Sequence, residues 1–255
     1  MAEYYFAGST DLGYKRMINE DYIDALKLSK DCVFIVAADG MGSRETDIQP
    51  AQLSCRLVCD EVKRLFDDDP EFLADNAEQL LPIIMRIPNE ALGALKAANK
   101  ETYSGVGSTL TCCFLTPKRK MYLAHTGNTR LYLIRNKNGT TGIRQLTTDH
   151  TAARELLDRN SITEEEYYVH HERNRLTSAL GFVSSPQIQV MSANVKENDI
   201  LLLTTDGIHY AVRHEVMLEI VIGSDNCGKA VENLIYAAKT QEYNDNMSAA
   251  VIYVK

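Results

Sequence analysis

The stretch Phe34–Gly42, FIVAADGMG, carries five apolar residues directly into an aspartate and a glycine. An uninterrupted apolar run of this length, with two β-branched members, predicts a strand that belongs to the core. A carboxylate at the end of such a strand is costly unless it is protonated or meets a cation. Gly40 lets the chain turn sharply and lets its own carbonyl approach a ligand. We therefore expect Asp39 to lie at a sheet edge and to belong to a site.

The same pattern recurs at Ile200–Gly207, ILLLTTDG, where an apolar strand again ends in Asp-Gly. Two further acids flank expected strands, since Glu20 follows the first strand and Asp245 precedes the last. A single Asp-Gly is more often only a turn, so the prediction rests on the joint occurrence. Two carboxylates about 4 Å apart repel by about 4 kcal/mol at an effective dielectric constant of 20. If the four acids converge, a divalent cation is the natural counter-charge, and all-oxygen ligands favour Mg²⁺ or Mn²⁺ over zinc.

The composition argues against several classes of partner. The chain has 255 residues and a net charge of −8, and an acidic surface disfavours nucleic acids and anionic membranes. No apolar run reaches the roughly 20 residues that span a bilayer, and the N-terminal residues do not resemble a signal peptide. The six cysteines show neither C-x-x-C nor zinc-ligand spacing. We expect a cytoplasmic protein with buried, reduced thiols that binds neither nucleic acid nor membrane.

The order of apolar segments predicts an α+β fold. Because many strands follow one another without crossover helices, we expect mainly antiparallel sheets with helices packed outside them. A polar, helical segment at 148–180 contains Ser161 and Glu164 at capping-box spacing and is expected to form a peripheral flap. We expect residues 1–255 to form one domain. Strands are expected at 3–8, 32–38, 107–116, 120–126, 129–135, 142–147, 188–195, 199–205 and 247–254. Helices are expected at 48–66, at 71–99, at 213–222 and at 227–242, and Pro82 and Pro88 are expected to break or restart the helix within 71–99.

Eight short blocks in this order resemble the PPM family (protein phosphatase type 2C) of metal-dependent Ser/Thr protein phosphatases, in its bacterial form. Each block alone is weak, but together they cover nearly the whole chain in one order. The blocks are Arg16-x-x-Asn19-Glu20-Asp21, Ala38-Asp39-Gly40-Met41-Gly42, Gly107-Ser108-Thr109, Gly127-Asn128-Thr129-Arg130, Leu146-Thr147-Thr148-Asp149-His150, Arg173-Asn174-Arg175-Leu176-Thr177-Ser178-Ala179-Leu180-Gly181, Thr205-Asp206-Gly207 and Asp245-Asn246.

The resemblance implies a four-layer α-β-β-α sandwich with two metal ions, Mn²⁺ or Mg²⁺, at one edge of the paired sheets. By position, Asp39 would bridge both metals. Asp206 and Asp245 would hold one of them. Glu20 and the backbone carbonyl of Gly40 would hold the other.

Three further residues receive roles through the resemblance. Arg16 would bind the substrate phosphate, for which a guanidinium fork is well suited. Asp21 and Asn246 would orient water molecules on the metals. The implied reaction is hydrolysis of phosphoserine and phosphothreonine in proteins by direct attack of a metal-bridging hydroxide, without a phosphoenzyme.

The implied partners are phosphorylated proteins and a cognate Ser/Thr kinase, and we expect a monomer. The alternative is a catalytically weakened relative that acts as a phosphoprotein-binding or regulatory module. Asn128 slightly favours this alternative, because the family has aspartate there. In bacterial members that aspartate helps to hold a third, weaker metal. We therefore hypothesise a weakened third-metal site beside an intact two-metal core, whereas the simpler interpretation is that Asn128 is a tolerated turn residue.

Overall fold

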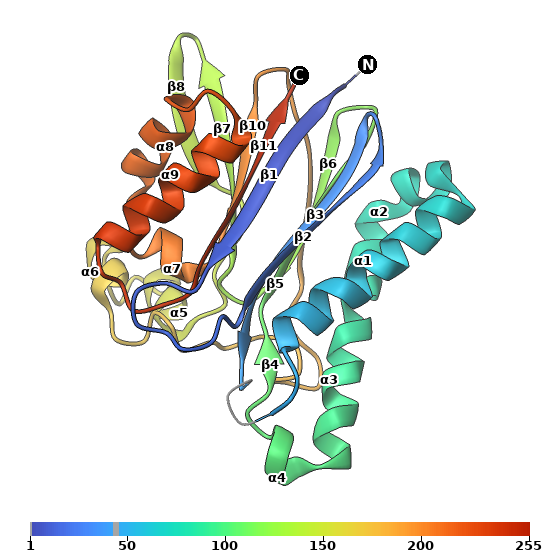
Figure 1. Cartoon of the computed structure of the whole chain (residues 1–255), viewed down its shortest axis with the longest axis vertical. Helices are drawn as coiled ribbons and strands as arrows, with labels where there is room; N and C mark the ends of the chain where they lie inside the picture. The colour runs from blue at the N-terminus through green and yellow to red at the C-terminus, as the bar shows by residue number, and fades with distance from the viewer. Residues whose placement is uncertain (1, 43–45) are drawn as a thin grey trace.

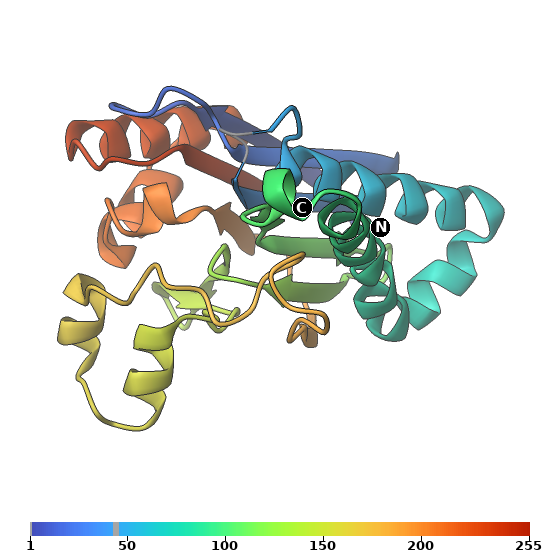
Figure 2. The ribbon, with the colours of Figure 1, turned by 90° about the horizontal axis from the view of Figure 1, so that it is seen from below.

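The computed structural model describes residues 2–42 and 46–255, and within them two sheets face each other between outer layers of helices (Figures 1 and 2). The pairings between the strands are antiparallel. The first sheet has five strands in the order β1-β11-β10-β7-β8, and the second has six, in the order β2-β3-β5-β6-β9 with β4 paired to β3. The expected four-layer α+β sandwich is confirmed.

The elements have the following bounds. The first sheet contains β1 (Tyr4–Asp11), β7 (Arg130–Lys137), β8 (Thr140–Gln145), β10 (Ile200–Thr204) and β11 (Met247–Val254). The second contains β2 (Asp21–Ser29), β3 (Cys32–Met41), β4 (Gly107–Ser108), β5 (Leu110–Leu115), β6 (Lys120–Thr126) and β9 (Gln189–Asn194). The helices are α1 (Pro50–Asp68), α2 (Pro70–Ile84), α3 (Arg86–Ala98), α4 (Lys100–Tyr103), α5 (Ala152–Asp158), α6 (Glu164–Val169), α7 (Asp206–His209), α8 (His214–Ile222) and α9 (Cys227–Thr240).

The strand β3 lies in the core, as its sequence predicts, and the structure places it between two apolar layers. Phe34 and Val36 point into the cluster under α1, α2 and α3, whereas Val33 and Ile35 point into the cluster between the two sheets. A third cluster packs the outer face of the first sheet against α8 and α9. Because both faces of β3 are buried, the register of this strand is strongly specified. The position of Asp39 at its end is therefore fixed by the core.

Several details differ from the sequence-based expectations. The strand β2 was not predicted, because it is an edge strand whose half-buried residues mix apolar and charged types without strict alternation. Pro82 lies inside α2, and the break falls at Met85, between α2 and α3, while Pro88 lies in the first turn of the restarted helix α3. The capping box of α6 is formed by Thr163 and Glu166 and not by the expected Ser161 and Glu164. Among the described residues, no helix has the length and apolar character needed to cross a bilayer.

The segment 148–180 is attached to the first sheet by a buried ion pair. Arg130 on β7 is 1% exposed, and its guanidinium donates to both carboxylate oxygens of Asp149, with distances of 2.6 to 3.0 Å. Asp149 also accepts hydrogen bonds from Tyr167 on α6 and from Gln145. Burial alone would raise the pKa of Asp149, but the guanidinium more than offsets it, and the pKa lies below its ordinary value.

We expect Arg130→Met to lower the free energy of unfolding by about 3–5 kcal/mol, because it leaves Asp149 buried without its cation. Urea denaturation followed by circular dichroism measures the loss. The matched control is Arg154→Met, which breaks the more exposed Arg154–Asp158 pair on α5 and should cost about 0.5 kcal/mol or less. Equal losses in the two variants would contradict the anchoring role of Arg130.

Candidate active site

The site begins with the register between β2 and β3, which places Asp21 directly opposite Asp39. The loop between β1 and β2, the start of α7 and the turn into β11 meet at the same end of the first sheet (Figure 1). These elements carry Glu20, Asp206 and Asp245 respectively. All four sequence-predicted acids thus act on one another electrostatically: Glu20, Asp206 and Asp245, together with Asp21, each raise the pKa of Asp39.

The backbone around Asp39 is fixed by close contacts. Its N–H donates to the hydroxyl of Thr109 at 2.8 Å, and its carbonyl accepts from the Thr109 N–H at 2.9 Å. The N–H of Gly40 donates to the carbonyl of Glu20 at 3.0 Å. A Cβ at position 40 would lie 2.7 Å from that same carbonyl oxygen. Glycine is therefore required at position 40 by the approach of the Glu20 backbone.

Asp21 is held by two hydroxyl groups. Thr205 and Ser248 each donate to its Oδ2 at 2.7 Å. Thr205 immediately precedes Asp206, and its own N–H donates to the carbonyl of Ser248 at 3.0 Å. Asp21 and Asp206 are both only 6% exposed. The two hydroxyls therefore tie β2, the start of α7 and β11 together beneath the acids.

Asn246 holds the β1–β2 loop against the same edge. Its side-chain oxygen accepts from the Glu20 N–H at 2.9 Å, and its amide donates to the carbonyls of Leu12 and Ile18 at 2.8 and 3.0 Å. On the other side, a Cβ at Gly207 would lie 1.9 Å from the carbonyl oxygen of Asn246. Asn246 thus positions the backbone that carries Glu20.

Burial and neighbouring carboxylates raise the pKa values of Asp21, Asp39 and Asp206. Burial is the largest cause at Asp39, and Asp206 is the strongest neighbouring charge, so the pKa of Asp39 lies well above its ordinary value. Burial, assisted by the charges of Asp245 and Asp21, raises the pKa of Asp206 to about 8. Burial also raises the pKa of Asp21 to about 7, although its two hydroxyl donors oppose this. The cluster therefore lacks positive charge in the conformation described.

Arg16 supplies only part of that charge. Its guanidinium contacts Asp245 at 2.6 Å and donates to the carbonyl of Asn244 at 3.2 Å. Burial raises the pKa of Asp245, and the Arg16 guanidinium opposes this rise. Among the described residues, no three His, Cys, Asp or Glu side chains are already arranged as a metal-binding group. Arg16 contacts an oxygen of Asp245, and neutral donors occupy one oxygen each of Asp206 and Asp21.

Asn128, the residue of the hypothesised third-metal site, lies next to the acids. It is 2% exposed, and its amide donates to Oδ2 of Asp206 at 3.2 Å. Asn128 lies two residues before β7, close to the ion pair that Arg130 forms with Asp149. The amide therefore satisfies one oxygen of Asp206 without adding charge.

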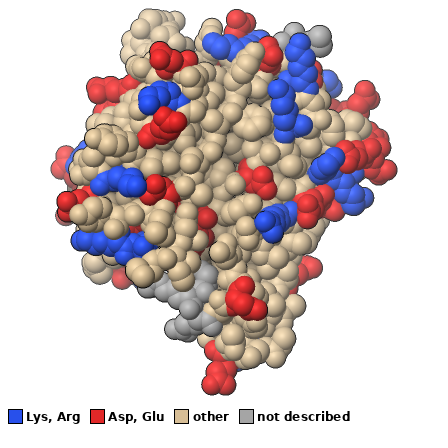
Figure 3. Space-filling view, viewed as in Figure 1, with Lys and Arg blue, Asp and Glu red and all other residues tan. Residues whose placement is uncertain are grey.

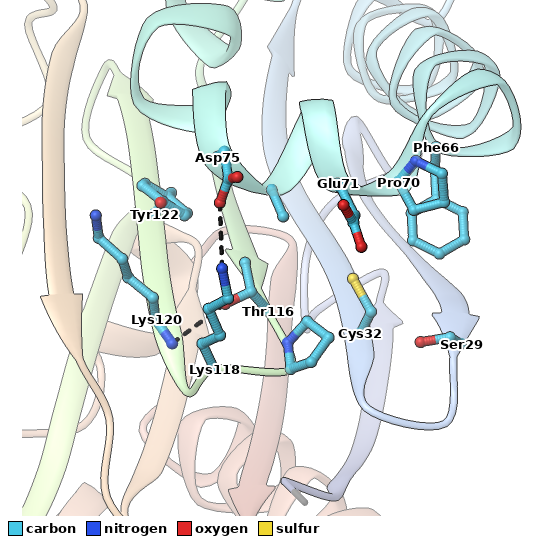
Figure 4. A pocket seen from close by; sticks show the side chains of 12 residues that line it. Ser29, Cys32, Phe66, Pro70, Glu71, Asp75, Thr116, Lys118, Lys120 and Tyr122 are labelled. Atoms are coloured by element: carbon cyan, nitrogen blue, oxygen red, sulfur yellow. Dashed lines mark hydrogen bonds and ion pairs between the residues drawn. The ribbon is translucent and has the colours of Figure 1, made fainter.

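The cysteines form no nucleophilic site. All six are free and buried, and burial raises the pKa of Cys32 and of Cys112 to about 12. Cys32 lines a cavity of about 790 Å³ below the junction of α1 and α2, where Lys118 reaches across to Asp75 (Figure 4). Asp39 lies seven positions after Cys32 along β3, which corresponds to about 23 Å. This cavity is remote from the acids.

A family model described as protein phosphatase 2C matches residues 14–222 of the chain. The chain belongs to the protein phosphatase 2C family. It is 26% identical over 243 residues to protein phosphatase PhpP of Streptococcus pneumoniae, covering 95% of this chain and 94% of that protein. It is also 26% identical to the serine/threonine phosphatase stp of Listeria monocytogenes, covering 95% and 93%.

Solved structures agree with the curated relatives. The chain superimposes on the Mycobacterium tuberculosis serine/threonine phosphatase PstP/Ppp with a TM-score of 0.82 and 26% identity, covering 98% of both chains. A structure of the PstP catalytic domain in complex with two manganese ions has a TM-score of 0.79 and 27% identity, covering 100% of this chain and 99% of that one. The expected protein phosphatase of the metal-dependent class, with phosphorylated proteins as substrates, is thereby confirmed. None of these observations favours the regulatory alternative.

Sequence reasoning assigned no role to several residues that shape the site. Thr109, Arg130, Asp149 and Thr205 lie within the recognised blocks, but their partners become visible only in the fold. Ser248 lies near the start of the last strand, β11, whose other residues are mostly apolar, and its hydroxyl faces Asp21. A small polar residue in an otherwise apolar buried strand is the signal that could have identified it.

We expect the metal-free protein to become less stable as the pH rises from about 4 to about 8. Asp21, Asp39, Asp206 and Asp245 have folded-state pKa values above the unfolded value of about 4. The folded chain therefore binds more protons within that window, and raising the pH then favours unfolding. Asp39→Asn should raise the melting temperature of the metal-free protein by several degrees at pH 8 and change it little at pH 5. Thermal unfolding in a metal chelator measures both.

The control for this experiment is Asp60→Asn, on the exposed face of α1, which should leave the pH dependence unchanged. Asp39→Asn should also remove most of the stabilisation that Mn²⁺ gives to the wild-type chain. If Mn²⁺ stabilised Asp39→Asn as much as it stabilises the wild type, Asp39 would not be a ligand of the proposed metal site.

Proposed function

We propose that this chain hydrolyses phosphoserine and phosphothreonine in proteins with two Mn²⁺ or Mg²⁺ ions held by the acids at the sheet edge. Asp39 would contact both ions, Asp206 and Asp245 one of them, and Glu20 with the carbonyl of Gly40 the other. The observation that carries the proposal is the convergence of these acids around Asp39, with raised pKa values at Asp39, Asp206 and Asp245. A set of oxygen ligands whose negative charge is not balanced by nearby cationic side chains fits Mn²⁺ and Mg²⁺.

Different residues of this chain would bind the substrate phosphate and orient water. Arg16 lies beside Asp245 at the half-exposed rim and would bind two phosphate oxygens of the substrate. Asp21 and Asn246 would orient water next to the acids, since both are already fixed by hydrogen bonds. When bound, the two cations supply a nucleophile at neutral pH and stabilise the charge of the phosphoryl group.

The wider context of the enzyme is also a proposal. A cognate Ser/Thr kinase must supply the phosphorylated substrate, because the reaction class consumes what such a kinase produces. The six free, buried cysteines support a reducing, cytoplasmic location, and the net charge of −8 supports the expected absence of nucleic-acid binding. We further propose that residues 1–255 act as one catalytic domain with 148–180 as a flap, and that the chain works as a monomer.

We expect hydrolysis of a phosphothreonine peptide to rise with added Mn²⁺ and to vanish in Asp39→Asn. Arg16→Gln should lower kcat/KM for the peptide by about 10- to 150-fold, the equivalent of about 1.5–3 kcal/mol for a charged hydrogen bond. The same variant should bind Mn²⁺ more tightly, because the guanidinium no longer competes for Asp245. Malachite-green phosphate release and isothermal titration calorimetry measure the two effects. Metal-independent hydrolysis would contradict the proposed function.

We expect Asn128→Asp to create a stronger additional Mn²⁺ site, because a second carboxylate would face Asp206 in place of the amide. Calorimetry should then detect one more bound ion per chain than in the wild type, and activity should depend more steeply on Mn²⁺. Asn136→Asp, at the exposed end of β7, is the matched control. Unchanged stoichiometry and unchanged metal dependence would refute the weakened third site.

A further inference from the structure

A groove of about 610 Å³ lies between the end of β1, the β1–β2 loop and α9. Tyr14 from the loop and Tyr236 from α9 line it and are 58% and 72% exposed. Ile235 contributes to the lining between them and is largely buried. Two large aromatic side chains left this accessible around an apolar hollow are typical of a recognition site.

The charged groups that line the groove are already paired. Asp11 accepts from Lys239 at 3.1 Å with one oxygen and from the Gly13 N–H at 2.8 Å with the other. Glu232 pairs with Lys229 at 3.0 Å. On this face, Lys and Arg are interspersed with Asp and Glu over a largely uncharged surface (Figure 3). The groove therefore favours an apolar or aromatic group over a charged one.

The groove shares a wall with the active site. The β1–β2 loop packs against the backbone that carries Asp245 so closely that a Cβ at Gly13 would lie 1.9 Å from the backbone carbonyl oxygen of Asp245. One residue beyond Tyr14 on this loop comes Lys15, and the next is Arg16, whose guanidinium contacts Asp245. Two residues span at most about 7 Å. Met17, the residue after Arg16, is 87% exposed, so the loop also presents an apolar side chain to solvent beside Arg16.

We propose that this groove binds an apolar or aromatic side chain of the phosphoprotein substrate, a few residues away from the phosphorylated Ser or Thr. The inference rests on the proposed function and adds to it a determinant of substrate choice. An extended peptide covers about 10 Å in three residues, so a chain with its phosphate at Arg16 reaches the groove without leaving the surface of the loop. Tyr14 from the β1–β2 loop and Tyr236 from α9 would then contact this side chain.

The test uses phosphothreonine peptides in an alanine background, with one phenylalanine placed at each of the four positions before and after the phosphothreonine. We expect one or two adjacent positions to raise kcat/KM by about tenfold, as one apolar group in a fitted pocket does. Tyr236→Ala should abolish this preference. The rate of p-nitrophenyl phosphate hydrolysis should be the same in the wild type and in Tyr236→Ala, because this substrate is too small to reach the groove. An unchanged rate also shows that the variant is folded.

Tyr5→Ala is the matched control, because Tyr5 is a 51% exposed tyrosine at the opposite end of β1, and it should keep the preference. A wild type without positional preference, or a Tyr236→Ala variant that keeps it, overturns the proposal. A dimer in sedimentation analysis that Tyr236→Ala dissociates also overturns it, since the occupant is then a second copy. Failure to hydrolyse p-nitrophenyl phosphate with Mn²⁺ would instead count against the proposed function.

Discussion

Electrostatic repulsion among acids at one edge of the sandwich is the constraint on which the rest of the structure depends. Asp21, Asp39 and Asp206 come from three different elements, and burial makes each of their charges costly. They can be held together only if the strands that carry them cannot slip. A one-residue shift of β3 would turn Asp39 to the opposite face, and it would also exchange the two apolar rows that fill separate core layers. The core therefore stabilises an arrangement that the charges oppose.

Neutral hydrogen-bond donors hold the acidic side chains in place but do not supply the positive charge that the cluster lacks. Hydroxyls from Thr205 and Ser248 hold Asp21, and the amide of Asn128 holds Asp206. These donors lower the cost of burial, yet they leave the pKa values raised. A fully neutralised cluster would be more stable but would offer less to a cation, which is the usual exchange between stability and function at an active site. The ion pair between Arg16 and Asp245 is the exception, because it lies at the half-exposed rim and can be rearranged.

The sequence was most informative where one physical requirement dominates. Five apolar residues before Asp39 determine a doubly buried strand, and the two Asp-Gly pairs mark carboxylates at strand ends. The strand β2 was missed because its residues are half-buried at a sheet edge, where no strict pattern is needed. The partnership of Arg130 with Asp149 could not be deduced either, since nineteen positions separate them and only the tertiary fold brings them together. Local pattern thus predicts the acids, while their supporting contacts depend on long-range packing.

The two sides of the site are built differently, and this difference affects how the site can select among protein substrates. On one side, the flap segment is attached through the buried pair of Arg130 and Asp149. On the other, the β1–β2 loop is clamped by Asn246 through backbone carbonyls, so its outer face can carry exposed tyrosine and methionine without endangering the acids. Phosphate binding is governed by charge and is common to every phosphoprotein. Selection among phosphoproteins must therefore come from surfaces that do not bind phosphate, and the rigid loop wall next to Arg16 offers an apolar one.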